Sequence, residues 1–101
     1  MAVVSFNVQQ IFERDSWRCQ SCGCDTPEHL RGTLADDAPK LDHIVPLSRG
    51  GSHSPENTQT LCRVCNLLKG SKMPDEWDEW RGAAWRVGGE KNSLPHCKRP
   101  S

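Results

Sequence analysis

Helical spacing of apolar residues predicts two helices, one near each end of the chain. In residues 7–15, three apolar side chains recur on one face: Val8, Ile11 and Phe12. Asn7 stands in front of them and suits the N-cap position. Residues 74–86 carry a second apolar face, formed by Trp77, Trp80 and Ala84. The region between these helices follows a different pattern.

That middle region predicts a strand, a loop and a helix. Residues 40–47, KLDHIVPL, form the predicted strand, which ends near its proline, and a loop rich in Ser, Gly, Pro and Asn follows at residues 48–57. The next segment begins extended and becomes helical from about Cys62 to Lys69, where Gly70 ends the helix. Strands together with helices in one small chain indicate the α+β fold class.

Two polar regions complete the predicted order of elements. Residues 16–24 carry a close pair of cysteines and a turn glycine, which is typical of a tight hairpin or zinc knuckle. Residues 25–39 are interpreted as an insertion with one helical turn in DTPEHL, capped by Asp25 or Thr26 and with a proline in its first turn. We expect one domain over residues 1–89 and a flexible tail over residues 90–101.

Composition limits the core that this domain can bury. The chain has 101 residues, of which 35% are hydrophobic, so a metal or disulfides are expected to supplement the core. No apolar run is as long as a membrane span, and the first residues lack the features of a signal peptide. We therefore expect an intracellular, cytoplasmic and reducing environment, in which six cysteines indicate metal ligands rather than disulfides.

Four of the cysteines form two Cys-x2-Cys pairs, which are Cys19 with Cys22 and Cys62 with Cys65. Four thiolates fit a tetrahedral structural zinc site, and two matched pairs favour zinc over a redox pair or two disulfides. The pairs are far apart in the sequence, so zinc would clamp two distant segments together. Cys24 is a competing ligand with poorer spacing, and Cys97 in the tail is expected to be free.

A closed site of four thiolates has no open position, so other residues must carry any reaction. His43 could act as a general base, because an imidazole titrates near neutrality. Asp42 points to the opposite face of the strand, where its carboxylate is a hard ligand for Mg²⁺ or Mn²⁺. Asn66 follows the second cysteine pair and offers another hard oxygen. Each residue alone is interpreted more simply as a strand-end, turn or surface group, but their combination favours a catalytic site.

The order CQSC, then LDHIVPLSRGGSHSPENTQT, then LCRVCNLLKG resembles the zinc-stapled subgroup of the HNH nuclease family. The resemblance covers residues 17–70 and implies a small ββα-metal fold, a hairpin and a helix around one divalent ion, with flanking helices. It departs from the commonest pattern at Asn66, where the family often has histidine; the HNH domain of CRISPR effectors also ends in asparagine. The loss of an imidazole favours Mg²⁺ or Mn²⁺ over Zn²⁺ or Ni²⁺ at the catalytic position.

The resemblance also implies a role for each residue of the motif. His43 would activate water as the general base, Asn57 would hold the loop of His43 by backbone hydrogen bonds, and Asp42 with Asn66 would bind the catalytic ion. The products would carry 5′-phosphate and 3′-hydroxyl ends. Basic residues near the motif could hold DNA phosphates, with solvated surface charge as an equal alternative for each: Lys69, Arg63, Lys72 and Arg49.

These inferences favour a metal-dependent endonuclease that nicks or cuts duplex DNA. By analogy of family, it would be a phage or restriction enzyme that acts with a DNA-packaging (terminase) or other partner protein. The alternatives are a zinc-stapled DNA-binding module without catalysis and a redox or metal-sensing protein. His53 is interpreted as a surface residue of the loop. Three tryptophans are expected to pack in the core rather than stack on bases: Trp77, Trp80 and Trp85.

Overall fold

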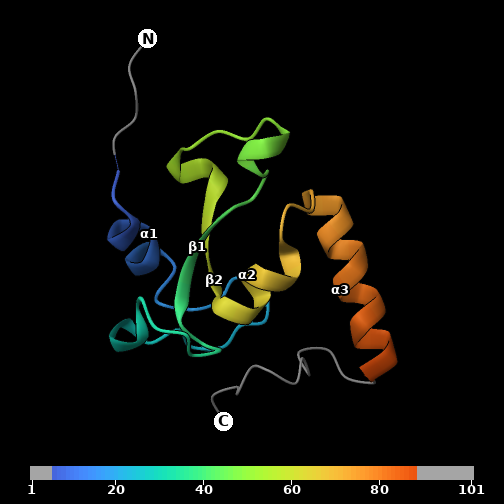
Figure 1. The fold of residues 1–101 in the computed structure, drawn as a ribbon, viewed down its shortest axis with the longest axis horizontal. Helices are drawn as coiled ribbons and strands as arrows, with labels where there is room; N and C mark the ends of the chain where they lie inside the picture. Colours follow the sequence, from blue (N-terminus) through green and yellow to red (C-terminus); the bar gives the residue numbers. More distant parts are fainter. Residues whose placement is uncertain (1–5, 89–101) are drawn as a thin grey trace.

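The computed structural model describes residues 6–88, with side chains up to Gly82, as a two-stranded sheet surrounded by helices (Figure 1). Its helices and strands are, in chain order, α1 (Val8–Arg14), β1 (Pro39–His43), β2 (Thr58–Cys62), α2 (Arg63–Lys69) and α3 (Pro74–Gly88). Three 3-10 turns lie in the connections, at Glu28–Leu30, Leu47–Arg49 and Pro55–Asn57. The α+β class is confirmed, and β1, β2 and α2 follow the order of a ββα fold. The predicted tail with Cys97 and the side chains of Ala84 and Trp85 lie outside the described residues.

Helix α1 begins where the sequence predicted, at a complete capping box. The Asn7 side chain accepts a hydrogen bond from the Gln10 backbone N–H at 2.9 Å, and the Gln10 side chain accepts one from the Asn7 N–H at 3.1 Å. At the other end, Asp15 Oδ2 accepts from the Thr60 N–H at 2.9 Å, and Arg14 Nη2 donates to the Thr58 carbonyl at 2.9 Å. The end of α1 is therefore fastened to the backbone of β2.

Strands β1 and β2 pair antiparallel, with Pro39 opposite Cys62 at one end and His43 opposite Thr58 at the other. Strand β1 ends at His43, so the expectation that it continues to near Pro46 is wrong. The physical reason is the side chain of Asn57, which bonds both the N–H of Val45 at 2.9 Å and its carbonyl at 3.0 Å. These bonds replace the ladder and turn the chain into the loop.

The insertion contains the predicted helical turn but not the predicted cap. The turn covers Glu28–Leu30, and Pro27 occupies the cap position without any side-chain hydrogen bond to the turn. Asp25 instead forms a β-bridge with Arg18, which closes the knuckle, and Thr26 is fully buried. Both expected capping residues thus belong to the knuckle and its packing.

Helix α2 starts at a residue with two structural roles. Cys62 is the last residue of β2 and the N-cap of α2, and its Sγ accepts a hydrogen bond from the Cys65 N–H. The helix ends at Lys69 as predicted, and Gly70 adopts a positive φ of 52° that a residue with a Cβ rarely takes. The strand-to-helix transition and the second cysteine pair therefore coincide.

Helix α3 packs along the outside of the knuckle and α2 (Figure 1). Trp77 is 4% exposed within the cysteine core, and Trp80 stacks on it with ring centroids 5.3 Å apart, which confirms the core role expected for these two residues. Arg81 Nη1 donates to the Ser21 carbonyl at 3.2 Å and fixes the helix to the knuckle. None of the described helices is long and apolar enough to cross a membrane.

Candidate functional site

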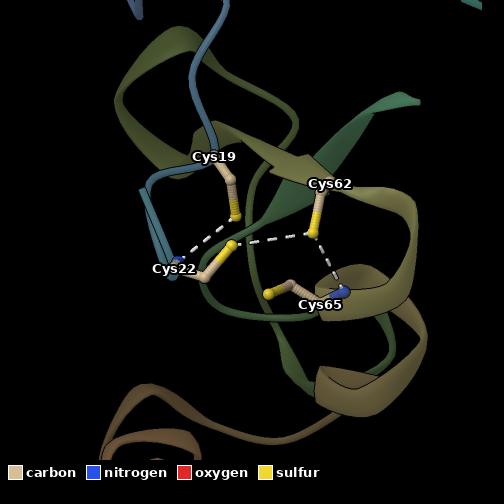
Figure 2. Close-up of side chains that lie close together, drawn as sticks. All are labelled: Cys19, Cys22, Cys62 and Cys65. Atoms are coloured by element: carbon tan, nitrogen blue, oxygen red, sulfur yellow. Dashed lines mark hydrogen bonds between the residues drawn. The ribbon is translucent and has the colours of Figure 1, made fainter. Parts of the chain in front are cut away.

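The four predicted ligand cysteines converge on one point. The sulfur atoms of Cys19, Cys22, Cys62 and Cys65 all lie within 4.8 Å of one another, and all four side chains are buried. Figure 2 shows that the first two come from the knuckle, the third from the end of β2 and the fourth from α2, with the sulfurs turned toward a shared centre. Four buried thiols at this spacing fit a tetrahedral zinc ion, so these cysteines could hold the predicted structural metal.

The two cysteine pairs are built in the same way. The N–H of Cys22 donates to Cys19 Sγ at 3.4 Å, and the N–H of Cys65 donates to Cys62 Sγ at 3.4 Å. Hydrogen bonds from the thiols of Cys19 and Cys22 lower the pKa of Cys62, which favours the thiolate form that binds metal. The repeated turn geometry presents both sulfurs of each pair to the same side.

Cys24 contacts this cluster through side-chain hydrogen bonds with Cys19, Cys22 and Cys62. Its side chain is fully buried in the same core, and its carbonyl accepts a hydrogen bond from the Cys19 N–H at 2.9 Å. The group of mutually close ligands contains only the two Cys-x2-Cys pairs. This grouping agrees with the spacing argument that preferred Cys22 over Cys24, and the choice of Cys22 as a ligand stays a prediction.

Asp42 lies on the face of β1 that is turned toward α2. Its side chain is 5% exposed, and Oδ2 accepts a hydrogen bond from Gln59 Nε2 at 2.9 Å and pairs with Lys69 Nζ at 3.3 Å. Burial raises the pKa of Asp42, while the Gln59 hydrogen bond and the Lys69 charge oppose that rise. Both contacts use Oδ2, which leaves Oδ1 for a further ligand.

Lys69 corrects one expectation about DNA contacts. Its side chain is 1% exposed, and Nζ donates to the carbonyls of His43 at 3.0 Å and Ile44 at 3.3 Å in addition to the Asp42 ion pair. An ammonium group that is surrounded in this way does not reach a DNA phosphate in this conformation. Lys69 instead ties the end of α2 to the backbone on both sides of the β1 terminus.

His43 is half-buried and faces the loop rather than α2. The pKa of the His43 imidazole is lowered, mainly by burial and to a smaller extent by electrostatic interaction with His53. His43 Nε2 lies 2.9 Å from Nδ1 of His53, so the two imidazoles share a hydrogen bond. The expectation that His53 is only a surface residue missed this contact. Local sequence gave no signal for it, because the loop must fold back before the two rings meet.

Asn57 organises the loop between the strands. The Asn57 side chain makes two bonds to Val45, and its Nδ2 also donates to the Ser52 carbonyl at 2.8 Å. The backbone carbonyl of Asn57 accepts a hydrogen bond from the Ile44 N–H at 2.8 Å. Gly51 lies against this network so closely that a Cβ there would overlap the Val45 carbonyl. Hydrogen bonds from one asparagine therefore fix both sides of the loop that follows His43.

Asn66 lies half-buried in α2, one residue after Cys65, and its carbonyl accepts a hydrogen bond from the Gly70 N–H at 3.1 Å. No hydrogen bond joins the side chains of Asn66 and Asp42 within the described part of the chain. The amide oxygen of Asn66 and Oδ1 of Asp42 are both hard donors, and Mg²⁺ needs only one or two protein oxygens. Asp42 and Asn66 thus offer the type of donor atom that a hard cation takes.

A cavity of about 190 Å³ lies next to the side-chain partners of Asp42. Gln59 and Lys69, the two partners of Asp42, line it from one side, and Trp77 and Arg81 of α3 line it from another. Ile44, which immediately follows the general-base candidate, completes the inner wall. Asp42 is not itself among the lining residues, so the cavity reaches it only through these two partners.

The three other basic candidates are less buried than Lys69. Arg63 Nη1 donates to the Leu34 carbonyl at 3.2 Å, and Lys72 Nζ donates to the Leu68 carbonyl at 2.8 Å. Arg49 Nη1 pairs with Glu76 at 2.6 Å, and the Arg49 side chain is 44% exposed. Exposed ion pairs of this kind contribute little stability, so Arg49 could exchange its partner for a phosphate at small cost.

Comparison with known families matches most of this region to one model. A family model described as HNH endonuclease matches residues 19–72, which is more than half of the chain. The matched segment begins at the first ligand cysteine, includes β1, β2 and α2, and ends just before α3. A comparison with curated proteins returned no match.

Proposed function

The chain belongs to the HNH endonuclease family, and from this membership we propose that it is a metal-dependent endonuclease that hydrolyses phosphodiester bonds of DNA. One observation carries the proposal: Asp42, His43 and Asn57 occupy one end of the hairpin in three different and complementary environments. The acid is buried, the histidine is half-exposed, and the asparagine fixes the loop that joins them.

His43 is proposed as the general base. Its lowered pKa keeps the imidazole neutral near pH 7, and a neutral imidazole can accept a proton from water. The backbone carbonyl of His43 is held by Lys69, and the following residues are held by Asn57. These bonds fix the backbone at and after His43, which helps to position the imidazole next to the attacking water.

Asp42 and Asn66 are proposed to hold Mg²⁺ or Mn²⁺. Such an ion, when bound, supplies charge stabilisation for the phosphate and for the leaving 3′ oxygen. Asp42 keeps its carboxylate fixed through Gln59 and Lys69, which orients Oδ1 for a ligand. The ammonium of Lys69 also offsets part of the negative charge, which points to modest affinity for a divalent ion without DNA.

DNA contacts are proposed for Arg49, Arg63 and Lys72, which are less buried than Lys69. The net charge of zero supports only modest non-specific affinity for DNA, so we further propose that a partner protein delivers the enzyme. A phage or packaging context, including a terminase partner and the host cytoplasm as its location, is part of this proposal and rests on analogy of family alone.

The test uses supercoiled plasmid and zinc-loaded protein with Mg²⁺ or Mn²⁺. We expect nicked or linear DNA from the wild type, no product with a chelator of the added ion, and at least a 100-fold slower reaction from His43→Ala. His29→Ala is the matched control, because His29 is exposed and lies in the insertion. A wild type that binds DNA but remains inert with either ion would favour the alternative, a zinc-stapled DNA-binding module.

A further inference from the structure

The contact between His43 and His53 is the most specific feature of the site that the family assignment does not explain. The two nitrogen atoms are 2.9 Å apart, and the ring centroids are 5.1 Å apart at an angle of 45°. The residues come from different segments, because His43 ends β1 and His53 lies in the loop before the next 3-10 turn. Direct contact between two imidazoles therefore depends on the path of the loop.

That path is tightly determined on both sides of His53. Gly50 adopts a φ of 93°, and Gly51 approaches the Val45 carbonyl too closely to carry a Cβ. The carbonyl of Ser52, the residue before His53, accepts a hydrogen bond from Asn57 Nδ2 at 2.8 Å. The hydroxyl groups of Ser52 and Ser54, on either side of His53, are hydrogen-bonded to each other at 2.8 Å. The backbone that carries His53 is thus held by the same network as the backbone after His43.

The ring of His53 is held as well as its backbone. Phe6 packs against it with ring centroids 4.8 Å apart, at an angle of 33°. His53 consequently has an aromatic neighbour beside it and the imidazole of His43 at its Nδ1. Contacts with two other rings therefore orient the His53 imidazole, although the residue is exposed.

The shared hydrogen bond determines which nitrogen of His43 can work as a base. A neutral imidazole carries one hydrogen, so one nitrogen donates and the other accepts. If Nε2 of His43 donates to Nδ1 of His53, Nδ1 of His43 is left without a hydrogen and can take a proton. If the bond ran in the opposite sense, His43 would carry its hydrogen on Nδ1 and could not act as a base there.

We propose that His53 is a positioning residue, which accepts the hydrogen bond from His43 Nε2 and so holds His43 in the tautomer whose Nδ1 accepts a proton from water. This inference rests on the proposed function. In the reaction, an O–H bond of water breaks as its oxygen bonds to phosphorus, and the proton moves to His43 Nδ1. The P–O3′ bond breaks, and the leaving oxygen takes a proton from solvent. His53 keeps its own hydrogen on Nε2 throughout.

The same bond is also geometrically compatible with the protonated His43 that follows. An imidazolium donates from both nitrogens, and Nδ1 of His53 already lies in place to accept from Nε2. The orienting partner of a catalytic histidine acts in this way in other hydrolases, where it is usually a carboxylate. Here Asp42 does not take that role, because its carboxylate contacts Gln59 and Lys69 instead.

The test compares three substitutions of His53 by plasmid cleavage with saturating metal ion. His53→Ala removes the acceptor and is expected to lower kcat by about 10- to 100-fold with little change in KM. His53→Asn is expected to recover much of kcat, because its amide atoms are attached to Cγ as Nδ1 is. His53→Gln, whose amide lies one bond further out, is not expected to recover it, and His29→Ala again serves as the control.

Nitrogen-15 NMR of the His43 imidazole, in zinc-loaded protein without DNA, provides a readout that does not depend on activity. We expect hydrogen on Nε2 in the wild type and a mixture of tautomers in His53→Ala. Full kcat in His53→Ala, or hydrogen on Nδ1 of His43 in the wild type, would overturn the proposal. Wild-type activity in His43→Ala would instead overturn the proposed function, and the NMR result would still decide whether His53 accepts the bond.

Discussion

The two ends of the hairpin are held by different kinds of interaction. At the end where Pro39 pairs with Cys62, four cysteines, each at most 2% exposed, form a group that could hold a zinc ion. At the end where His43 pairs with Thr58, the chain is held by hydrogen bonds and one ion pair. A closed thiolate site is strong and chemically inert, whereas hydrogen-bonded imidazoles stay reactive. The fold thus separates its source of stability from its proposed chemistry by the length of one short strand.

Removing zinc is expected to have the largest effect on the difference between the two ends, because it should destabilise the whole domain. We expect a strong zinc chelator, or Cys62→Ser, to unfold the domain, because zinc contributes about 10 kcal/mol or more to small folds of this type. Circular dichroism and zinc content per chain would measure the loss. Cys24→Ser is the matched control, since Cys24 is equally buried but outside the ligand group, and it should retain one zinc ion. A chelated protein with an unchanged spectrum would contradict the prediction.

Removing the charge of Lys69 should destabilise the opposite end of the hairpin by less. In Lys69→Met, the Asp42 carboxylate and the carbonyls of His43 and Ile44 lose their buried partner, which should cost about 3–5 kcal/mol in unfolding free energy. Urea unfolding with zinc in excess measures the change. Lys72→Met removes a half-buried ammonium that bonds one carbonyl and lies over the Trp80 ring, and it should cost only about 1 kcal/mol because no buried carboxylate loses its partner. Equal effects of the two substitutions would show that Lys69 is not a buried anchor.

The smallest expected effect concerns Asp15, which fastens α1 to β2. Burial alone would raise the pKa of Asp15, but hydrogen bonds from Arg14 and Thr60 outweigh it, and the pKa lies below its usual range. The stabilisation is therefore complete above the unfolded-state pKa of about 4 and is lost as the pH falls through the lower folded-state value. Asp15→Asn should cost about 1 kcal/mol.

That cost should be the same at pH 7 and pH 5, because both pKa values of Asp15 lie below this range. Urea unfolding of wild type and Asp15→Asn, with zinc in excess, compares the two conditions. Glu13→Gln provides the control, because Glu13 is exposed on α1 and makes one side-chain bond to Gln9. A cost that shrinks between pH 7 and pH 5 would indicate that burial prevails and that the pKa is raised.

Features fixed by local chemistry could be predicted from the sequence. The cap of α1 needs only Asn7 and Gln10, and the cysteine cluster needs only two pairs at ligand spacing. The end of α2 follows from Gly70 in the same local way. Such signals are readable because the interacting groups lie within one turn of each other, or share one metal.

Features that depend on distant contacts could not be predicted from the sequence. Strand β1 ends at His43 because Asn57 takes over the bonds of Val45, which no propensity of the strand reveals. Lys69 was expected to contact DNA because it lies near the motif in the sequence, yet its partners are carbonyls at the end of β1, which is distant in the sequence. Gln59 faces Asp42 only through the register of the hairpin, and His53 meets His43 only through the closed loop.

Cys62 is the last residue of β2, the cap of α2 and a sulfur donor at once, and its place in the chain sets the order in which the protein can mature on the ribosome. His43, His53 and Asn57 are translated before Cys62, so at that stage they belong to a chain that still lacks two of the four grouped cysteines. Only Cys19 and Cys22 of that group exist then, too few for a closed site of four thiolates. We therefore expect the nascent domain to assemble only once its hairpin is finished, and tight zinc retention by a chain truncated before Cys62 would argue against this order.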